Sequence, residues 1–232
     1  MLNPERVAAF HRDGFVLGDQ VLSDGEVEEL RQELDRVIDN YQDDTKPQPV
    51  RIANLGGDEQ APVWQIVNMW QASQPFRLLT HHPKIVAEVA QLLSAQELRV
   101  WHDQVQYKPS GTGGITGWHQ DSPAWPNIAP KTTQISSWVA LDDVDESNGC
   151  MSMVVGSHKW GVVRGVFPHG RHFDQMPDEF EGIKLEVRLC PVKKGYVHYH
   201  HALTWHGSHA NDSGRKRRAI ANHYMTEKTV YD

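Results

Sequence analysis

The stretch LRVWHDQVQYKPSGTGGITGWHQD, residues 98–121, marks the point where the hydrophobic pattern of this chain changes. Before it, apolar residues such as Val27, Leu30 and Leu34 recur at steps of three and four, as on one face of a helix. Beyond residue 97, short segments rich in β-branched and aromatic residues are separated by Gly, Pro, Asn and Asp, which is typical of strands and turns. We predict strands at residues 98–108, 115–121, 133–141, 150–155, 184–190, 195–201 and 217–226.

The N-terminal third of the chain is predicted to be mainly helical. Ser23 and Glu26 have the spacing of a capping box, and a helix is predicted to follow over residues 24–41. A further helix is predicted over 83–94, whereas the polar residues 42–62, which contain proline and glycine, are predicted to form a loop. Helices followed by six or more short strands favour a sandwich, jelly roll or barrel that carries helices on one side.

Composition excludes several classes of protein. The 232 residues are 39% hydrophobic and 23% charged, which is typical of a globular domain. A net charge of −7 argues against a general nucleic-acid binder, and no apolar run reaches the roughly 18 residues of a membrane span. The first twenty residues lack the apolar core of a signal peptide, and the two cysteines are too few for a disulfide scaffold. We therefore expect a cytoplasmic protein that contacts neither nucleic acid nor membrane.

The segment Trp118-His119-Gln120-Asp121 contains the first candidate metal ligands. Alternate residues of a strand point to one face, so His119 and Asp121 can bind the same ion. An imidazole and a carboxylate are two of the three ligands in a 2-His-1-carboxylate site, which leaves positions open on Fe(II). A solvated pair at a strand end has the same spacing, so this motif alone leaves both interpretations open.

The second candidate is the segment Thr204-Trp205-His206-Gly207-Ser208, in which His206 follows His119 by 87 residues. A jelly roll brings distant strands together, so it can place this histidine beside the first pair. Arg217 follows in a segment predicted as a strand, where it shares a face with Ala219 and Ala221. Small neighbours leave room for a long side chain, so we predict that Arg217 points inward and pairs with a carboxylate, rather than lying in a solvated basic turn.

Three blocks of the sequence carry a resemblance to a known family. They are YKPSGTGGITGWHQD (107–121), WVALDDVDESNGCMSMVVGSHKWG (138–161) and GYVHYHHALTWHGSHANDSGRKRRAIANHY (195–224). Together they contain His-x-Asp, an Asn-Gly-Cys turn, a Gly-Ser-His turn, and His-Gly-Ser followed by an asparagine and an arginine. In this combination the chain resembles, over most of its length, the phytanoyl-CoA dioxygenase family of Fe(II)- and 2-oxoglutarate-dependent oxygenases.

The resemblance implies a fold and an activity. The fold would be mainly β: a double-stranded β-helix, the jelly-roll or cupin-like core, over residues 96–232, with mostly helical support over 1–95 in the same single domain. The activity would be hydroxylation of an aliphatic carbon of a small-molecule substrate, consuming O2 and 2-oxoglutarate and forming succinate and CO2. Halogenating relatives carry a small residue in place of the carboxylate ligand, so the intact Asp121 favours hydroxylation.

The resemblance also implies a role for individual residues. His119, Asp121 and His206 would bind Fe(II), and Arg217 would pair with the distal carboxylate of 2-oxoglutarate. The other residues implied at the cosubstrate are Ser208, Trp138 and Gln106. For Gln106, which shares a predicted strand face with Gln104 and His102, an outward polar face is the alternative. Candidates for substrate contact are Trp125, His158, Phe167 and Thr116, each of which ordinary packing would also explain.

Two other functions and one other metal pair stay open. The chain could be a non-catalytic jelly-roll protein that binds a metal and a small molecule, or a cupin-like metal-dependent hydrolase or isomerase. His198 and His200 share a strand face, but they lack a carboxylate at matching spacing. Neither substrate identity nor oligomeric state follows from the sequence.

Overall fold

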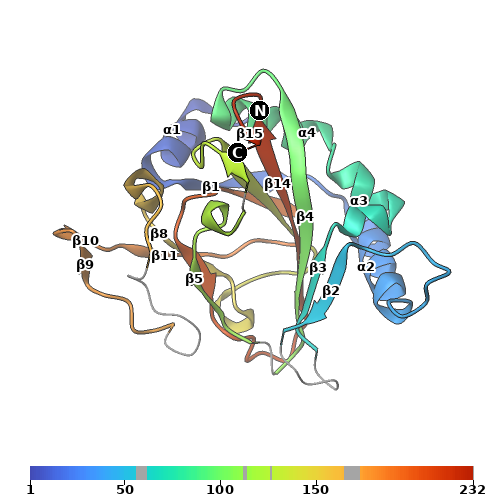
Figure 1. The fold of residues 1–232 in the computed structure, drawn as a ribbon. Helices are drawn as coiled ribbons and strands as arrows, with labels where there is room; N and C mark the ends of the chain where they lie inside the picture. Colours follow the sequence, from blue (N-terminus) through green and yellow to red (C-terminus); the bar gives the residue numbers. More distant parts are fainter. Residues whose placement is uncertain (56–61, 112–113, 126, 165–172, 232) are drawn as a thin grey trace.

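Two β-sheets of seven and four strands face each other in the computed structural model, which describes residues 1–55, 62–111, 114–125, 127–164 and 173–231. The described α-helices lie along the outer side of the larger sheet (Figure 1). The fold is therefore mainly β with flanking helices, as predicted. None of the described helices combines the length and the apolar character needed to cross a membrane.

Each sheet combines strands from distant parts of the chain. The larger sheet has the order β1 (Phe15–Gln20), β12 (Tyr196–His201), β7 (Gln134–Ala140), β14 (Arg217–Thr226), β4 (Leu98–Lys108), β3 (Trp64–Val67) and β2 (Arg51–Asn54). The smaller sheet has the order β11 (Val187–Cys190), β8 (Met151–Val154), β13 (His206–Ser208) and β5 (Thr116–His119). Two short ladders pair β15 (Val230–Tyr231) with β6 (Ile128–Ala129), and β10 (Ile183–Lys184) with β9 (Glu179–Phe180).

The helices begin and end where local signals place them. They are α1 (Pro4–Asp13), α2 (Asp24–Asp39), α3 (Gln74–Leu79) and α4 (Pro83–Leu93). At the start of α2, the Ser23 side chain accepts from the backbone N–H of Glu26, whose carboxylate accepts in return from the Ser23 backbone, so the predicted capping box is present. Short 3-10 helices occur at Met69–Gln71, Ser122–Ala124, Glu146–Asn148 and Ser157–Trp160.

Alternation along β14 separates the helix-facing core from the space between the sheets. Ile220 belongs to the large buried cluster that α2 and α4 form with the larger sheet. Ala219 and Ala221 belong to a second cluster, in which Met151 and Met153 of the smaller sheet also take part. Residues of odd number on β14 therefore face the smaller sheet. This places Arg217 inward, as its small neighbours predicted.

The structure corrects the predicted loop over residues 42–62. β2 lies within that range and pairs with β3, which in turn pairs with β4. Both strands are only four residues long and flank the undescribed residues 56–61, so alternation over so short a run was not recognisable. The predicted strand 115–121 is also too long, because β5 ends at His119.

The inner face of α2 should supply much of the stability of the helical layer. Leu34 on α2 is completely buried, whereas Leu78 on α3 is 63% exposed. Leu34→Ala should lower the free energy of unfolding by about 2–5 kcal/mol, because a cavity remains in the core. Leu78→Ala makes the same chemical change at the surface and should shift that free energy by less than about 0.5 kcal/mol. Equal urea midpoints for the two variants would contradict this packing.

Candidate metal centre

The pairing of β5 with β13 brings two distant histidines together. The strands are antiparallel, and His206 lies directly opposite His119 in their register. The centroids of the two imidazole rings are 4.2 Å apart. Because β13 also pairs with β8 on its other side, His206 lies inside the four-stranded sheet rather than at its edge. The jelly-roll topology thus makes neighbours of residues that are far apart in the sequence.

Asp121 completes the cluster, although not in the way that strand alternation predicted. β5 ends two residues earlier, and Asp121 has helical backbone angles (φ −68°, ψ −54°) at the start of the 3-10 helix Ser122–Ala124. This turn brings the Asp121 Oδ1 atom to 3.6 Å from Nε2 of His119 and 3.6 Å from Nε2 of His206. The three side chains offer ligand atoms that all lie within 4.8 Å of one another.

Hydrogen bonds around the cluster orient each side chain. Nδ1 of His119 is 2.8 Å from the Gly117 carbonyl, and Nδ1 of His206 is 2.8 Å from the Thr204 carbonyl. A carbonyl only accepts, so both Nδ1 atoms carry a proton, and in the neutral ring each Nε2 atom offers its lone pair to a metal ion. Such second contacts are typical of metal-binding histidines.

The Asp121 carboxylate is held from its far side. Its Oδ2 atom accepts from the Ser136 hydroxyl at 2.8 Å and lies 3.1 Å from Nε2 of His200. Ser136 also contacts Nδ1 of His223 at 2.7 Å. These three residues leave the Oδ1 atom, which faces His119 and His206, available for a metal ion.

Electrostatics keep the carboxylate of the cluster ionised and one of its two imidazoles neutral. Burial opposes ionisation of Asp121, but the neighbouring imidazoles of His206, His119 and His200 hold the pKa of that carboxyl well below its usual value. Burial lowers the pKa of His206 to about 3, so this imidazole is neutral at neutral pH. Burial acts against protonation of His119, but the hydrogen bond and charge of Asp121 raise the pKa of that imidazole, so binding of Fe(II) would displace its extra proton. An ionised carboxylate and neutral imidazoles are the forms that coordinate divalent metals, so these residue types fit Fe(II).

A second feature of the site is an unpaired buried cation. Arg217 is 1% exposed, and its Nη2 atom donates to the Gly149 carbonyl at 3.1 Å and the Ser208 hydroxyl at 3.4 Å. Its Nε and Nη1 atoms have no hydrogen-bond partner within the described part of the chain. The guanidinium lies over the Trp138 ring, 5.4 Å from its centroid. Two unpartnered N–H edges on a buried guanidinium fit a carboxylate, so the site also fits 2-oxoglutarate.

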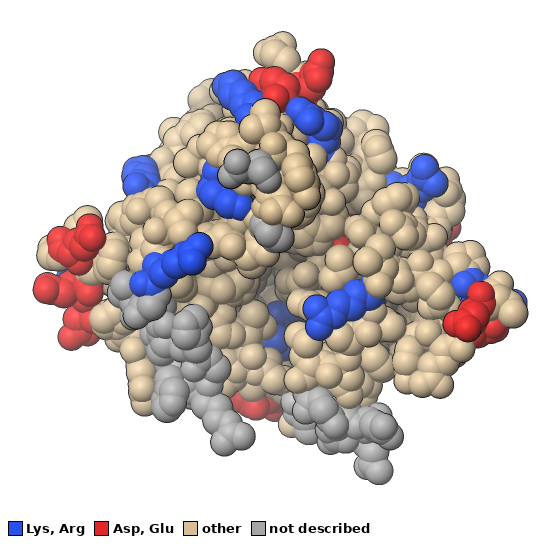
Figure 2. Space-filling model, viewed as in Figure 1, with Lys and Arg blue, Asp and Glu red and all other residues tan. Residues whose placement is uncertain are grey.

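The other predicted cosubstrate residues line a cavity that also contains His119, Asp121 and His206. Gln106 and Trp138 line it together, and the Trp138 Nε1 atom donates to the Gln106 Oε1 atom at 3.2 Å. Ser208 and Thr116 also line it. Figure 2 shows this face of the molecule hollowed between β5 and β4, which Figure 1 labels, with Lys or Arg atoms at the base of the hollow. Gln106 therefore faces the site rather than solvent.

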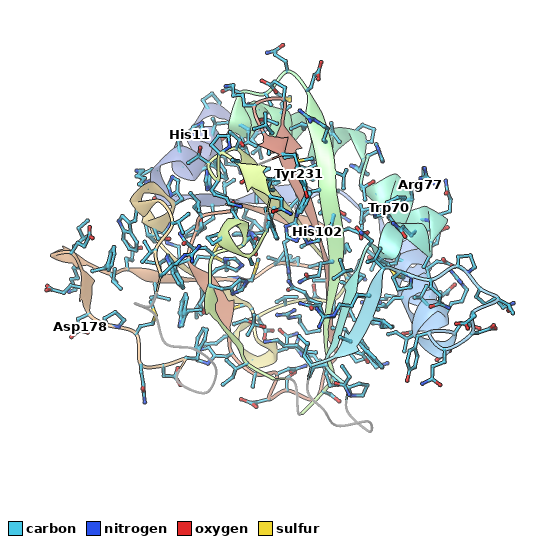
Figure 3. All side chains as sticks on the ribbon, viewed as in Figure 1. His11, Trp70, Arg77, His102, Asp178 and Tyr231 are labelled. Carbon is cyan, nitrogen blue, oxygen red and sulfur yellow. The ribbon has the colours of Figure 1, made fainter. Side chains whose placement is uncertain are left out.

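The remaining substrate candidates lie apart from this cavity. Trp125 packs on His102, which Figure 3 labels on β4, with ring centroids 5.5 Å apart. His158 packs on His201 at 5.4 Å, and neither His158 nor Trp125 is among the described residues that line the cavity. Phe167 lies outside the described residues. Of the three substrate candidates that the structure describes, only Thr116 lines the cavity.

Sequence reasoning missed several residues that the fold brings to the centre. His200, considered only as part of a pair with His198, contacts Asp121 instead. Ser136 and His223 carried no motif, and their role follows from strand register alone. Lys108 lies within the quoted block 107–121, but a lysine before a proline gave no sign that its side chain is 3% exposed.

Residues 10–219 match the protein family described as phytanoyl-CoA dioxygenase (PhyH). The chain is 25% identical over 246 residues to peroxisomal phytanoyl-CoA dioxygenase of Bos taurus, with 100% of this chain and 71% of that protein covered. It is 26% identical over 244 residues to ectoine dioxygenase of Bordetella parapertussis, with 99% and 76% covered.

Similar folds occur among solved structures. One is a non-heme alpha ketoglutarate dependent carbocyclase, SnoK from nogalamycin biosynthesis, with a TM-score of 0.81 and 28% identity over 99% of this chain and 86% of that one. Another is the epimerase SnoN in complex with Fe3+, alpha ketoglutarate and nogalamycin RO, with a TM-score of 0.76 and 25% identity over 98% and 84%.

Gly207 should be essential for the approach of β13 to β5. A Cβ atom at this position would lie 2.8 Å from the Thr116 carbonyl oxygen and 2.7 Å from the Phe173 ring. Gly207→Ala should push His206 away from His119 and weaken Fe(II) binding at least about tenfold, as loss of ligand geometry does. Gly214→Ala, where nothing lies within 4 Å of the added atom, is the matched control and should bind Fe(II) normally. Unchanged anaerobic Fe(II) titration of Gly207→Ala would contradict this role.

Ser136 should increase the affinity of the site for Fe(II) through its hydrogen bond to the Asp121 Oδ2 atom. Ser136→Ala removes the donor to the Asp121 Oδ2 atom, so Fe(II) affinity should fall about 10- to 100-fold. Ser137→Ala is the control, because Ser137 is equally buried on the same strand but contacts Asn222 instead. Equal Fe(II) dissociation constants for the two variants would show that the hydrogen bond to Asp121 has no such role.

Proposed function

The chain belongs to the phytanoyl-CoA dioxygenase family, and we propose that it hydroxylates an aliphatic carbon of a small organic molecule. The protein is an Fe(II)- and 2-oxoglutarate-dependent dioxygenase, so O2 is consumed and succinate and CO2 are formed. The observation that carries the proposal is a buried Arg217 guanidinium with two unpartnered nitrogen atoms, which lines the same hollow as His119. A metal site alone would not need this cation.

The metal ligands in this proposal are His119, Asp121 and His206. When bound, Fe(II) with 2-oxoglutarate supplies the activation of O2 that no amino-acid side chain provides. The contribution of the chain is to hold the ion on one side only, because the three ligand atoms come from two adjacent strands and the turn after one of them. The opposite side stays available for cosubstrate and O2.

The cosubstrate is oriented by side chains on the strands around the cavity. Arg217 and Ser208 would hold its distal carboxylate, while Trp138 and Gln106 form the wall beside its chain. Fixing the far end of the cosubstrate determines where its keto acid end meets the metal before O2 arrives. The buried setting also strengthens the guanidinium–carboxylate interaction, because little water competes with it.

The substrate would approach from the side of His119. Its side chain is 39% exposed, whereas those of Asp121 and His206 are 13% and 8% exposed. The adjoining hollow shares Gln106, Thr116 and His119 with the metal cavity. Lys108 and Arg217 line the cosubstrate end of this hollow. The rest of it extends over β3, β4 and the residues next to β2 and β3, namely Leu55, Val63, Trp64, Gln65, Gln104 and Tyr107. These neutral amides and apolar side chains support a small organic substrate.

We also propose that the chain forms one catalytic domain in the cytoplasm. Buried residues of α2 within the predicted support 1–95 share one core with buried residues of β4, β7 and β14 within 96–232. The two cysteines, Cys150 and Cys190, are both buried and unpaired, which supports a reducing compartment.

An anaerobic binding experiment should test the proposed activity. Addition of 2-oxoglutarate to the metal-free protein mixed with Fe(II) should give a visible metal-to-ligand charge-transfer band. Arg217→Ala should lose the band at the same concentration, because the distal carboxylate loses its partner. Arg215→Ala removes an exposed arginine paired with Asp145 and should keep the band.

The same experiment separates the alternatives. A non-catalytic binding protein would give the band but no succinate when O2 is admitted with candidate substrates. A cupin-like hydrolase or isomerase would give no band, and that result with the unaltered chain would overturn the proposed function. Mass spectrometry of the products for a gain of one oxygen would then identify the substrate.

A further inference from the structure

Lys108 and Arg217 form an unusual pair of buried cations. They lie directly opposite each other in the antiparallel register of β4 and β14. Their exposed fractions are 3% and 1%, and their hydrogen-bond partners among the described residues are carbonyl and hydroxyl oxygens rather than carboxylates. Like charges directly opposite each other in a sheet are destabilising, and burial without a counter-ion adds to the cost. Such an arrangement is typical of a site whose missing negative charge comes from a ligand.

The Lys108 ammonium group reaches the cosubstrate cavity through Ser208. Its Nζ atom donates to the Ser208 Oγ atom at 2.7 Å and to the His209 carbonyl. The Arg217 Nη2 atom also points at Ser208 Oγ, at 3.4 Å. Ser208 lines the metal cavity, and Lys108 and Arg217 line the hollow next to it.

The hydrogen bonds of Ser208 determine where its proton points. A serine hydroxyl has two acceptor lone pairs and one donor hydrogen. Arg217 and the ammonium form of Lys108 have only donors, so in the state that binds an anion both contacts use the lone pairs of Ser208. The hydroxyl hydrogen must therefore point away from both cations, and no described group of the protein accepts from it.

We propose that Lys108 is a positioning residue for the distal carboxylate of 2-oxoglutarate. Lys108 holds Ser208 as an acceptor, so that the Ser208 hydroxyl donates to the carboxylate that Arg217 also binds. This inference rests on the proposed function, because it takes the ligand of the cavity to be 2-oxoglutarate. It adds a residue that acts on the cosubstrate through a neighbour, without touching the metal or its ligands.

The environment of Lys108 supports a role that depends on a ligand. Burial and the neighbouring Arg217 charge lower the pKa of Lys108 to about 6, against opposing effects of Cys150 and Asp212. The ammonium form is therefore poorly stabilised by the protein itself. A carboxylate bound at Arg217 would supply the negative charge that this pair of cations lacks.

The test compares two cosubstrates that differ only at the far end. The probes are 2-oxoglutarate and 2-oxovalerate, a 2-oxo acid of equal chain length without the distal carboxylate. Both are titrated anaerobically into the Fe(II)-loaded protein, and the charge-transfer band gives each dissociation constant. Lys108→Met should weaken 2-oxoglutarate binding by roughly tenfold or more, as loss of a hydrogen bond to a charged group does. Binding of 2-oxovalerate should stay within about twofold of the unaltered protein.

A matched control and a second substitution sharpen the result. Lys216→Met removes a positive charge from an exposed neighbouring position and should change neither dissociation constant. Ser208→Ala should weaken 2-oxoglutarate binding, and adding Lys108→Met to it should cause a much smaller further loss. That non-additivity is expected if Lys108 acts through Ser208.

Three outcomes would overturn the inference. These are an unchanged affinity of Lys108→Met for 2-oxoglutarate, an equal loss for both probes, and a full tenfold loss for Lys108→Met in the Ser208→Ala background. Should Lys108→Met fail to fold, as judged by its melting temperature, Lys108→Gln replaces it under the same criteria. Failure of the proposed function itself looks different, because the unaltered protein would then give no band with 2-oxoglutarate.

Discussion

The ladder between β5 and β13 is the interaction on which the site depends. It places His206 opposite His119, and it needs a glycine at position 207, where a larger residue would meet the Thr116 carbonyl. Backbone hydrogen bonds thus define the position of the two histidines that we propose as metal ligands, while the turn after β5 adds Asp121. Ligands carried by paired strands are held more rigidly than ligands on loops, which suits a centre that must keep its geometry while cosubstrate and O2 bind.

The two sides of the site differ in charge: one carries the carboxylate of Asp121, and the other carries the basic side chains Arg217 and Lys108. Around the metal, Asp121 is surrounded by histidines and a serine hydroxyl, so its negative charge is stabilised before any ion binds. On the cosubstrate side, Arg217 and Lys108 are buried without a carboxylate among the described residues. That unpaired positive charge costs stability in the free protein. In the proposed function this imbalance would favour an anionic ligand, so the two sides would accept opposite charges.

Sequence patterns predicted the long, regular elements well and the short ones poorly. The helix predicted over 24–41 is α2, and the strands predicted over 98–108 and 217–226 agree with β4 and β14 to the residue. β2, β3 and β13 were missed, because three or four residues are too few for alternation to be recognised. Their pairing partners lie elsewhere in the chain, and only the assembled sheets stabilise them.

What the sequence determined by itself was the chemistry of the site: two histidines, an aspartate and an inward arginine, in the order and spacing of a known family. Which neighbours surround them was decided by the tertiary structure. His200 and Ser136 reach Asp121, and Lys108 reaches Ser208, through strand registers between segments up to a hundred residues apart. A motif records residue types along the chain, whereas hydrogen bonds and buried charges depend on distances in space, and those exist only after the sheets have closed.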